Sequence, residues 1–191
     1  MNKENVLFIG SFKELSGNFA GGQNLACRLL VDGLSGSYDF ITIDTTAPTN
    51  LKRHRYEILV SGLFRLSVFL RHLLFSRFTK AIVFSSHGYS LIEKGIYAII
   101  LGSCGKSVIF CPRSGLILND LTRRQKFIQK VVDASDVVVC QSAYWKSLFV
   151  SNFPGENEKY HVVYNCIELP HYSLLKHKKT SFSLNLLFLG W

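Results

Sequence analysis

The sequence lacks several motifs that commonly mark a functional site. Its five cysteines are scattered and contain no CxxC pair. This pattern disfavours a zinc site or a disulfide framework and predicts free, buried thiols in a reducing cytosol. Neither a GxGxxG fingerprint nor a Walker A loop is present. A dinucleotide site or a P-loop nucleotide site therefore has no motif to support it.

Long uncharged stretches, internal repeats and low-complexity tracts are also absent. No run of about eighteen residues is free of charge, so we expect no membrane-spanning helix. Residues 1–5 are polar and lead directly into an apolar run, which is not the pattern of a secretory signal. Because 48% of the residues are hydrophobic and the mean hydropathy is +0.18, we expect a folded cytoplasmic domain with a large core.

Acidic residues are scarce relative to basic ones. The sequence has 13 Asp and Glu against 22 Lys and Arg, which gives a formal net charge of +9. This charge suits nucleic acid, an anionic membrane surface or a phosphate-bearing substrate, and it also fits a surface that is merely basic. Basic residues interleaved with aromatic ones, or a known nucleic-acid module, are not evident, so we expect no nucleic-acid partner.

Short apolar runs alternate with helical patterns along most of the chain. Strands are predicted at 6–9, 40–43, 81–84, 107–111, 137–140 and 160–164. Helices are predicted at 23–34, 56–78 (bent near Ser61 and Gly62), 90–101, 120–134 and 143–150. This alternation predicts an α/β fold with a doubly wound parallel sheet, Rossmann-like in class. A polar, basic segment at 171–183 reads as a linker, and 184–191 contains one further strand.

Open parallel sheets bind ligands beyond the carboxyl ends of their strands. The segments that follow these ends hold glycines, hydroxyls, one histidine and one arginine, but few carboxylates. Such a set suits phosphate and sugar hydroxyls better than a metal ion, and we expect no metal site. The residues that we single out are Gly21, Gly22, Ser86, His87, Arg113, Ser142 and Asn165.

Gly21 and Gly22 directly precede the first predicted helix. Without Cβ atoms they let an anion approach the backbone, and a helix N-terminus presents free N–H groups. A turn that requires glycine explains the pair equally well. Asp44 ends the second strand, where a dinucleotide-binding fold places its ribose-binding acid, but the glycine fingerprint of that fold is missing.

His87 and Arg113 each follow a predicted strand. His87 could donate to a substrate hydroxyl or act as a base, and structural hydrogen bonding within its loop is the alternative. A fixed guanidinium at Arg113 suits bidentate phosphate binding, with a salt bridge to a neighbouring loop as the alternative. Ser142 and Asn165 are expected to support these groups, although Asn165 also fits a structural cap at the sheet edge.

A narrow basic stripe follows the very apolar helix predicted at 56–78. Arg65 and His72 are seven residues apart and share a face, and Arg71 lies beside them. A basic stripe beside apolar bulk suits contact with an anionic membrane. A core helix with one wetted edge is the alternative.

Five segments, taken in order, resemble glycosyltransferase family 4 of the GT-B fold. Two of them resemble its glycine-rich loop and its "PRG" or "PHG" element, namely GNFAGGQ at 17–23 and FCPRSGL at 110–116. ASDVVVCQS at 134–142 resembles the family's "A-D" segment that ends in serine, and VVYNCIE at 162–168 resembles its "V-I-P-N-G-(V/I)-D" segment. LLFLG at 186–190 resembles the strand that opens its second domain.

The resemblance implies two facing Rossmann-like domains with a nucleotide-sugar cleft between them. It implies transfer of a sugar from a nucleotide-diphosphate donor to a glycan or lipid-linked acceptor during cell-surface polysaccharide synthesis, without a cofactor or required metal. The setting that it implies is cytoplasmic, with peripheral contact at the inner face of the cell membrane. It assigns residues 1–170 to the acceptor-side domain, 171–183 to a linker and 184–191 to the first strand of a donor-side domain.

The resemblance also assigns roles, with some departures. It gives phosphate contact to Gly21 and Gly22, and acceptor or phosphate contact to His87 and Arg113, the latter standing where many members have histidine. Cys166, Tyr164 and Trp191 replace the usual glycine, proline and arginine. The E-x7-E element of the donor-side domain is not in the sequence, so we expect little or no transferase activity from this chain alone.

Two other classes of protein remain open. One is a non-catalytic module that binds an acceptor or a membrane, or a subunit of a split enzyme that pairs with a separate C-terminal-domain polypeptide. The other is a dinucleotide-dependent oxidoreductase.

Overall fold

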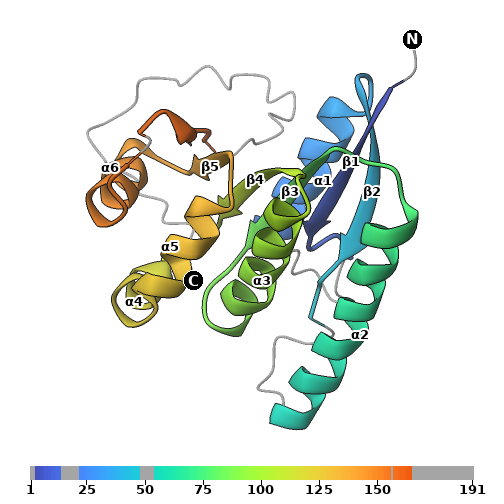
Figure 1. Ribbon diagram of the computed structural model, residues 1–191, viewed down its shortest axis with the longest axis horizontal. Coiled ribbons are helices and arrows are strands. Elements are labelled where there is room, and N and C mark those ends of the chain that lie inside the picture. Colours follow the sequence, from blue (N-terminus) through green and yellow to red (C-terminus); the bar gives the residue numbers. More distant parts are fainter. Residues whose placement is uncertain (1–2, 14–21, 48–53, 156, 165–191) are drawn as a thin grey trace, which may run out of the picture.

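Six parallel strands form the centre of the computed structural model, which describes residues 3–13, 22–47, 54–155 and 157–164 (Figure 1). Helices flank this sheet, which confirms the predicted α/β, doubly wound, Rossmann-like class. Gly21, Asn165, the predicted linker at 171–183 and the predicted strand within 184–191 lie outside the described residues.

The order of the strands creates a switch point in the sheet. The order is β2-β1-β3-β4-β5-β6. The strands are β1 Glu4–Gly10, β2 Tyr38–Asp44, β3 Lys80–Ser85, β4 Ser107–Pro112, β5 Val137–Cys140 and β6 Tyr160–Val162. Because β2 pairs with one side of β1 and β3 pairs with the other, the progression of the chain reverses between β1 and β3. Doubly wound folds bind ligands beyond the strand ends at such a point.

Both faces of the sheet are covered. The helices are α1 Gly22–Leu34, α2 Arg55–Phe75, α3 Tyr89–Ser103, α4 Ile117–Arg123, α5 Gln125–Asp133 and α6 Ala143–Asn152, with a 3-10 turn η1 at Asn157–Lys159. Buried side chains of α2 to α6 join one core cluster, and α1 packs on the opposite face of the sheet. This double cover explains why β1 and β3 are near-continuous apolar runs.

The end of β1 approaches α1 closely. A Cβ built on Gly10 would lie 2.7 Å from the Sγ atom of Cys27, whereas one built on Gly22 meets nothing within 4 Å. The close packing of β1 on α1 therefore requires glycine at position 10 but not at position 22. The Cα of Gly10 is paired in register with Asp44, so both strands deliver their last residues to the same edge.

Two helices differ from their predicted extents. The helix predicted at 56–78 is α2, which continues without a break through Ser61 and Gly62 and ends at Phe75 rather than at residue 78. Ser61 Oγ donates to the carbonyl of Ile58, so the hydroxyl is satisfied within the helix. The cost of a helical glycine is only about 1 kcal/mol, too little to force a break.

The helix predicted at 120–134 is in fact two helices, α4 and α5. Arg124 lies between them with a non-helical backbone, at φ −130° and ψ 28°. Its guanidinium pairs with the carboxylate of Asp120. Asp120 also accepts the backbone N–H of Gly88, so it joins the β3–α3 loop to α4 rather than continuing a regular helix face.

The described cysteines are all free thiols. Cys27, Cys111 and Cys140 are buried as predicted, but Cys104 is exposed at the end of α3. Burial raises the pKa of Cys27 and of Cys111 to about 12, and that of Cys140 to about 11.

Candidate functional site

A cavity of about 790 Å³ lies at the switch point of the sheet. We call it the rim cavity. Its walls come from four segments: the turn after β1 with the start of α1, the turn after β2, one side of α2, and the start of α3 with the loop before it. The lining residues are Ser11, Lys13, Gln23, Asn24, Thr45, Thr46, Ala47, Ile58, Leu59, Gly62, Leu63, Arg65, Leu66, Ser86, Tyr89, Ser90, Ile92, Glu93, Lys94, Ile96 and Tyr97.

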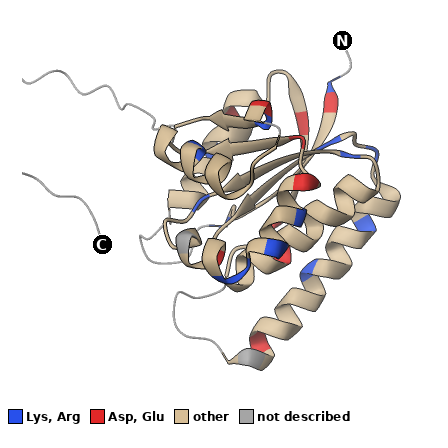
Figure 2. Ribbon diagram, turned by 60° about the vertical axis from the view of Figure 1, so that its left-hand side comes forward, with Lys and Arg blue, Asp and Glu red and all other residues tan. Residues whose placement is uncertain are grey.

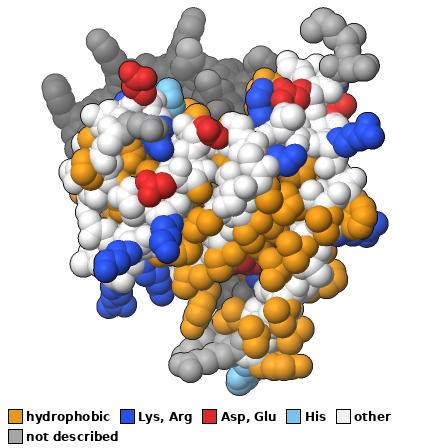
Figure 3. Space-filling model, viewed as in Figure 1, with side chains coloured by type: hydrophobic (Ala, Val, Ile, Leu, Met, Phe, Trp, Pro, Cys, Tyr) orange, Lys and Arg blue, Asp and Glu red, His pale blue; other side chains and the backbone are white. Residues whose placement is uncertain are grey.

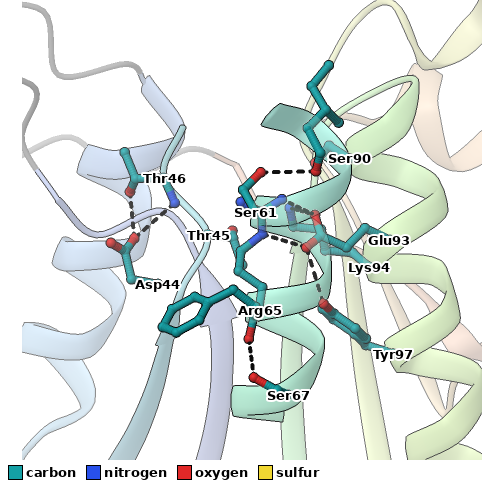
Figure 4. Close-up of polar contacts among 12 residues, drawn as sticks. Asp44, Thr45, Thr46, Ser61, Arg65, Ser67, Ser90, Glu93, Lys94 and Tyr97 are labelled. Atoms are coloured by element: carbon teal, nitrogen blue, oxygen red, sulfur yellow. Dashed lines mark hydrogen bonds and ion pairs between the residues drawn. The ribbon is translucent and has the colours of Figure 1, made fainter. Parts of the chain in front are cut away.

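Asp44 organises the wall formed by β1 and β2. Its Oδ1 atom accepts the backbone N–H groups of Phe12 and Thr46, each at 3.0 Å, and the hydroxyl of Thr46 at 2.5 Å. Figure 4 shows the two contacts with Thr46. Burial by itself raises the pKa of Asp44, but these donors and Lys13 offset it and leave the pKa below its usual value. Asp44 is therefore an ionised loop anchor whose Oδ1 atom is already occupied.

An ion-pair cluster connects the two helical walls. Arg65 of α2 points to Glu93 of α3, with Nε 2.5 Å from Oε1 and Nη2 3.2 Å from Oε2 (Figure 4). Lys94 Nζ lies 3.0 Å from Oε2 of the same carboxylate, and the Tyr97 hydroxyl donates to Oε1 at 3.2 Å. The cluster brings one negative and two positive charges to the cavity wall.

Glu93 is held in its ionised form. Burial by itself raises its pKa, but the Lys94 ammonium and the Arg65 guanidinium more than offset this, so the pKa lies below its usual value. A paired carboxylate of this kind is a poor proton acceptor for catalysis. It remains a good hydrogen-bond acceptor for a hydroxyl group.

Asn24 supplies a polar group that the described residues do not fully satisfy. Its side chain is 4% exposed and lines the rim cavity. The amide nitrogen donates to the carbonyl of Lys13, whereas Oδ1 has no hydrogen-bond partner among the described residues. A buried amide oxygen of this kind is costly unless a ligand or water donates to it.

Of the predicted site residues, Ser86 lines the rim cavity and His87 does not. His87 is exposed beside it, with Nδ1 2.8 Å from Ser114 Oγ and 3.2 Å from Ser86 Oγ. Gly88, which follows, has a φ of 62°, a left-handed conformation that favours glycine. His87 therefore lies beyond the carboxyl ends of β3 and β4, in contact with the hydroxyl groups of Ser86 and Ser114.

Arg113 follows the neighbouring strand β4 and does not line the rim cavity. Its backbone N–H donates to Ser85, and its guanidinium stacks over the Phe84 ring at 4.5 Å. Phe84 belongs to the core on the α1 face, as do Cys27 and Cys111. Arg113 and His87 therefore follow the neighbouring strands β4 and β3.

The remaining predicted site residues are Ser142, Gly22, Gly21 and Asn165, and neither of the two that the structure describes, Ser142 and Gly22, lines the rim cavity. Ser142 caps α6, because its Oγ accepts the backbone N–H of Trp145 at 3.3 Å. Gly22 is the first residue of α1 and is exposed. Gly21 and Asn165 lie outside the described residues, as noted above.

The predicted basic stripe on α2 is not a single exposed surface. Arg65 turns inward to Glu93 and is 13% exposed in its side chain. Arg71 is exposed, and His72 Nδ1 lies 3.0 Å from Ser76 Oγ. The stripe therefore divides into an internal ion pair and one exposed cation.

Sequence reasoning missed Asn24, Arg65, Glu93 and Lys94 as parts of the site. A signal was available, because Arg65 and the Glu93–Lys94 pair interrupt two otherwise apolar helices, and charges in such positions need partners. Among the described residues, no group of three His, Cys, Asp or Glu is placed to hold a metal ion. Polar and apolar residues both line the rim cavity, which therefore suits a ligand that has both hydroxyl groups and apolar surface.

These features define a Rossmann-like α/β domain with an amphipathic cavity at its switch point. No protein-family model matches the chain, and comparison with curated proteins finds no match.

Proposed function

We propose that this chain is the acceptor-side domain of a family 4-like GT-B glycosyltransferase. In this proposal, the rim cavity holds a glycan or lipid-linked acceptor, and a donor-side domain or polypeptide presents the nucleotide-diphosphate sugar. Such catalysis depends on positioning the acceptor and stabilising the departing diphosphate. The chain alone is then expected to bind acceptor but to have little or no transferase activity.

The observation that supports this proposal is the composition of the rim cavity. Ser90 and Asn24 offer hydroxyl and amide groups, and Glu93 offers a paired carboxylate. Leu63 and Ile92 line the same cavity and contribute apolar surface. Sugars require several fixed hydrogen-bonding groups with apolar surface beneath the ring, and this cavity supplies both.

His87 has a separate role in the proposal. It stands beside the cavity, next to Ser86 and Ser114, where an incoming donor would complete the site. There it would contact the acceptor hydroxyl or the donor phosphate, while Arg113 would act from the adjacent strand end. A matched test is His87→Gln in the reconstituted two-domain enzyme, where we expect turnover to fall without loss of acceptor binding.

A dinucleotide-dependent oxidoreductase is less favoured, since Oδ1 of Asp44 already accepts three donors from this chain. A non-catalytic acceptor-binding module would share the same cavity. It differs from the main proposal only in lacking transfer when a donor-side polypeptide is added.

The experiment is a titration of the 191-residue chain with an alkyl glucoside below its micellar concentration, with nucleotide diphosphates and with NADH. Calorimetry would measure binding. We expect saturable binding of the glycoside in the rim cavity. Failure of every glycoside and nucleotide to bind would reject the proposal, and tight NADH binding would favour the oxidoreductase.

Two glycine variants locate that binding. Gly62 lines the rim cavity and Gly33 does not, and both are helical glycines whose added Cβ meets nothing within 4 Å. Gly62→Phe should fill the cavity and abolish glycoside binding. Gly33→Phe, the matched control, should bind like the native chain. Equal binding by both variants would place the ligand elsewhere.

A further inference from the structure

The outer face of α2 is apolar along nearly its whole length. Eight large hydrophobic residues of this helix are between 39% and 82% exposed. They are Tyr56, Leu59, Val60, Leu63, Phe64, Leu70, Leu74 and Phe75, and we call them the α2 ridge. Their spacing of three and four residues places them on one side of the helix. Figure 3 shows hydrophobic side chains gathered over α2 and the neighbouring α3.

The inner side of α2 is fastened to the domain. Phe69 is fully buried and stacks on Tyr97 of α3, with ring centroids 4.4 Å apart. Arg65 is held by Glu93 of the same helix α3. By length and composition alone, Tyr56–Phe75 is apolar enough to cross a membrane, with a mean hydropathy of 1.7. A helix fastened along one side to α3 is instead suited to lie flat on a surface.

The positive charge of the chain favours a negatively charged partner for the α2 ridge. The whole chain has a net charge of +9, and Figure 2 shows few acidic residues along α2. Arg71 is exposed within the span of the ridge, and Arg77 is exposed just after α2. On the face that carries the ridge, Lys and Arg side chains also gather over the region of α4 and α5 (Figures 1 and 3). In those helices the exposed cations are Arg123, Lys126 and Lys130.

We propose that the α2 ridge docks on an anionic lipid bilayer. The ridge enters the boundary between headgroups and acyl chains, and the cations of α4 and α5 contact the anionic headgroups. This differs from the sequence-based expectation, because Arg65 does not face the membrane. A second copy of the chain is a weaker candidate, since the high positive charge opposes self-association and the face is a convex ridge rather than a groove.

Docking would also place the rim cavity at the bilayer. Leu59 and Leu63 belong to the α2 ridge and line the cavity as well. The mouth of the cavity and the lipid-facing surface are therefore continuous. This part of the inference rests on the proposed function and narrows its acceptor to an amphiphile that resides in the membrane.

The test is sedimentation of the 191-residue chain with vesicles. One set contains phosphatidylcholine alone, and the other contains equal parts of phosphatidylcholine and phosphatidylglycerol. We expect strong sedimentation with the anionic set and weaker sedimentation with the neutral set. Absence of binding to anionic vesicles would overturn the proposal. Because the vesicles carry no sugar or nucleotide, this outcome would leave the proposed sugar-transfer function standing.

A pair of double variants separates the ridge from general charge. Leu63→Glu/Phe64→Glu should lower the partition coefficient at least about tenfold. Leu34→Glu/Tyr144→Glu changes two exposed apolar residues on α1 and α6 and alters net charge equally, and it should lower binding much less. Equal losses in the two variants would overturn the ridge as the docking surface.

Fluorescence quenching and light scattering test whether α2 itself contacts the lipid. Phe64→Trp should gain fluorescence quenching from brominated lipids, whereas Tyr144→Trp on α6 should not. Quenching of both, or of neither, counts against docking through α2. Light scattering gives the oligomeric state. If the chain is a dimer that Leu63→Glu/Phe64→Glu dissociates, and if it does not bind vesicles, the partner of the α2 ridge is a second copy of the chain and the proposal is overturned. Circular dichroism verifies that each variant is folded.

Discussion

Arg65 and Glu93 join α2 to α3 through a two-point ion pair. The guanidinium Nε and Nη2 atoms lie 2.5 Å and 3.2 Å from the two carboxylate oxygens. Their side chains are only 13% and 16% exposed, so water screens the pair weakly. Lys94 contacts the same carboxylate. Two cations thus share a single anion at this joint, which leaves one net positive charge.

This arrangement predicts an asymmetric cost of mutation. Glu93→Gln removes the carboxylate that Arg65 and Lys94 share, and we expect it to lower the free energy of unfolding by about 2–4 kcal/mol. Arg65→Gln leaves Glu93 paired with Lys94 and should cost about 1–2 kcal/mol. Urea unfolding followed by circular dichroism measures both. The reverse order of the two costs would contradict the assigned cluster.

The same carboxylate predicts a dependence of stability on pH. The pKa of Glu93 is lower in the folded chain than its ordinary value of 4.5. The resulting stabilisation is present above that ordinary value and is lost as the pH falls through the lower, folded value. Between about pH 5 and pH 3, the unfolding free energy of the native chain should therefore fall more steeply than that of Glu93→Gln. Parallel curves would show that Glu93 is not stabilised in its charged form. Asp44 titrates in both proteins, so the comparison isolates Glu93.

Thiol labelling should follow burial. Cys104 is exposed, whereas Cys27, Cys111 and Cys140 are buried with raised pKa values. Because the thiolate is the reactive form, N-ethylmaleimide at about pH 8 should modify Cys104 rapidly and the three buried thiols only after unfolding. Peptide mapping by mass spectrometry reads out each position. Rapid modification of Cys27 in the folded chain would argue against the close packing of α1 on β1.

A methyl group at Gly10 should be poorly tolerated. It would lie 2.7 Å from Cys27 Sγ, and Gly10→Ala should cost about 1–3 kcal/mol of stability. Gly22→Ala is the matched control, because nothing lies within 4 Å of its added Cβ, and it should be neutral or slightly stabilising.

A double variant identifies the cause of that cost. Cys27→Ala removes the sulfur atom, so Gly10→Ala/Cys27→Ala should be less destabilised than the sum of the two single variants. Thermal unfolding of the four proteins gives the coupling. Simple additivity would mean that Gly10 matters for a reason other than its contact with Cys27.

The fold followed from local pattern, and most of its errors arose from tertiary contacts. The strands at 81–84 and 137–140 were predictable because buried parallel strands are short apolar runs between turn residues. The division of the predicted 120–134 helix was not, since it depends on Asp120 bonding to Gly88, 32 residues away. Helix α2 continues through Gly62 because one helical glycine is a weak perturbation.

The candidate site was predictable in place but not in detail. The rule for carboxyl ends of parallel strands led to the edge of the sheet at which the rim cavity lies, and Ser86 lines that cavity. The pairing of Arg65 with Glu93 joins residues on separate helices, so no spacing rule could find it. The direction of Arg113, stacked over Phe84, likewise depends on which sheet face its side chain takes.

Leu59 and Leu63 belong at once to the lip of the cavity and to the outer surface of the molecule. An amphiphile could therefore slide in sideways without its chain ever passing through water. Each methylene that stays among lipid tails avoids an exposure cost of about 0.8 kcal/mol. Short water-soluble analogues should therefore bind more weakly than a long-chain amphiphile that resides in the bilayer. Binding assays for this chain should express the ligand as a mole fraction of the lipid. The surface density of ligand in the membrane, and not its molar concentration in solution, then sets the fraction of rim cavities that are filled.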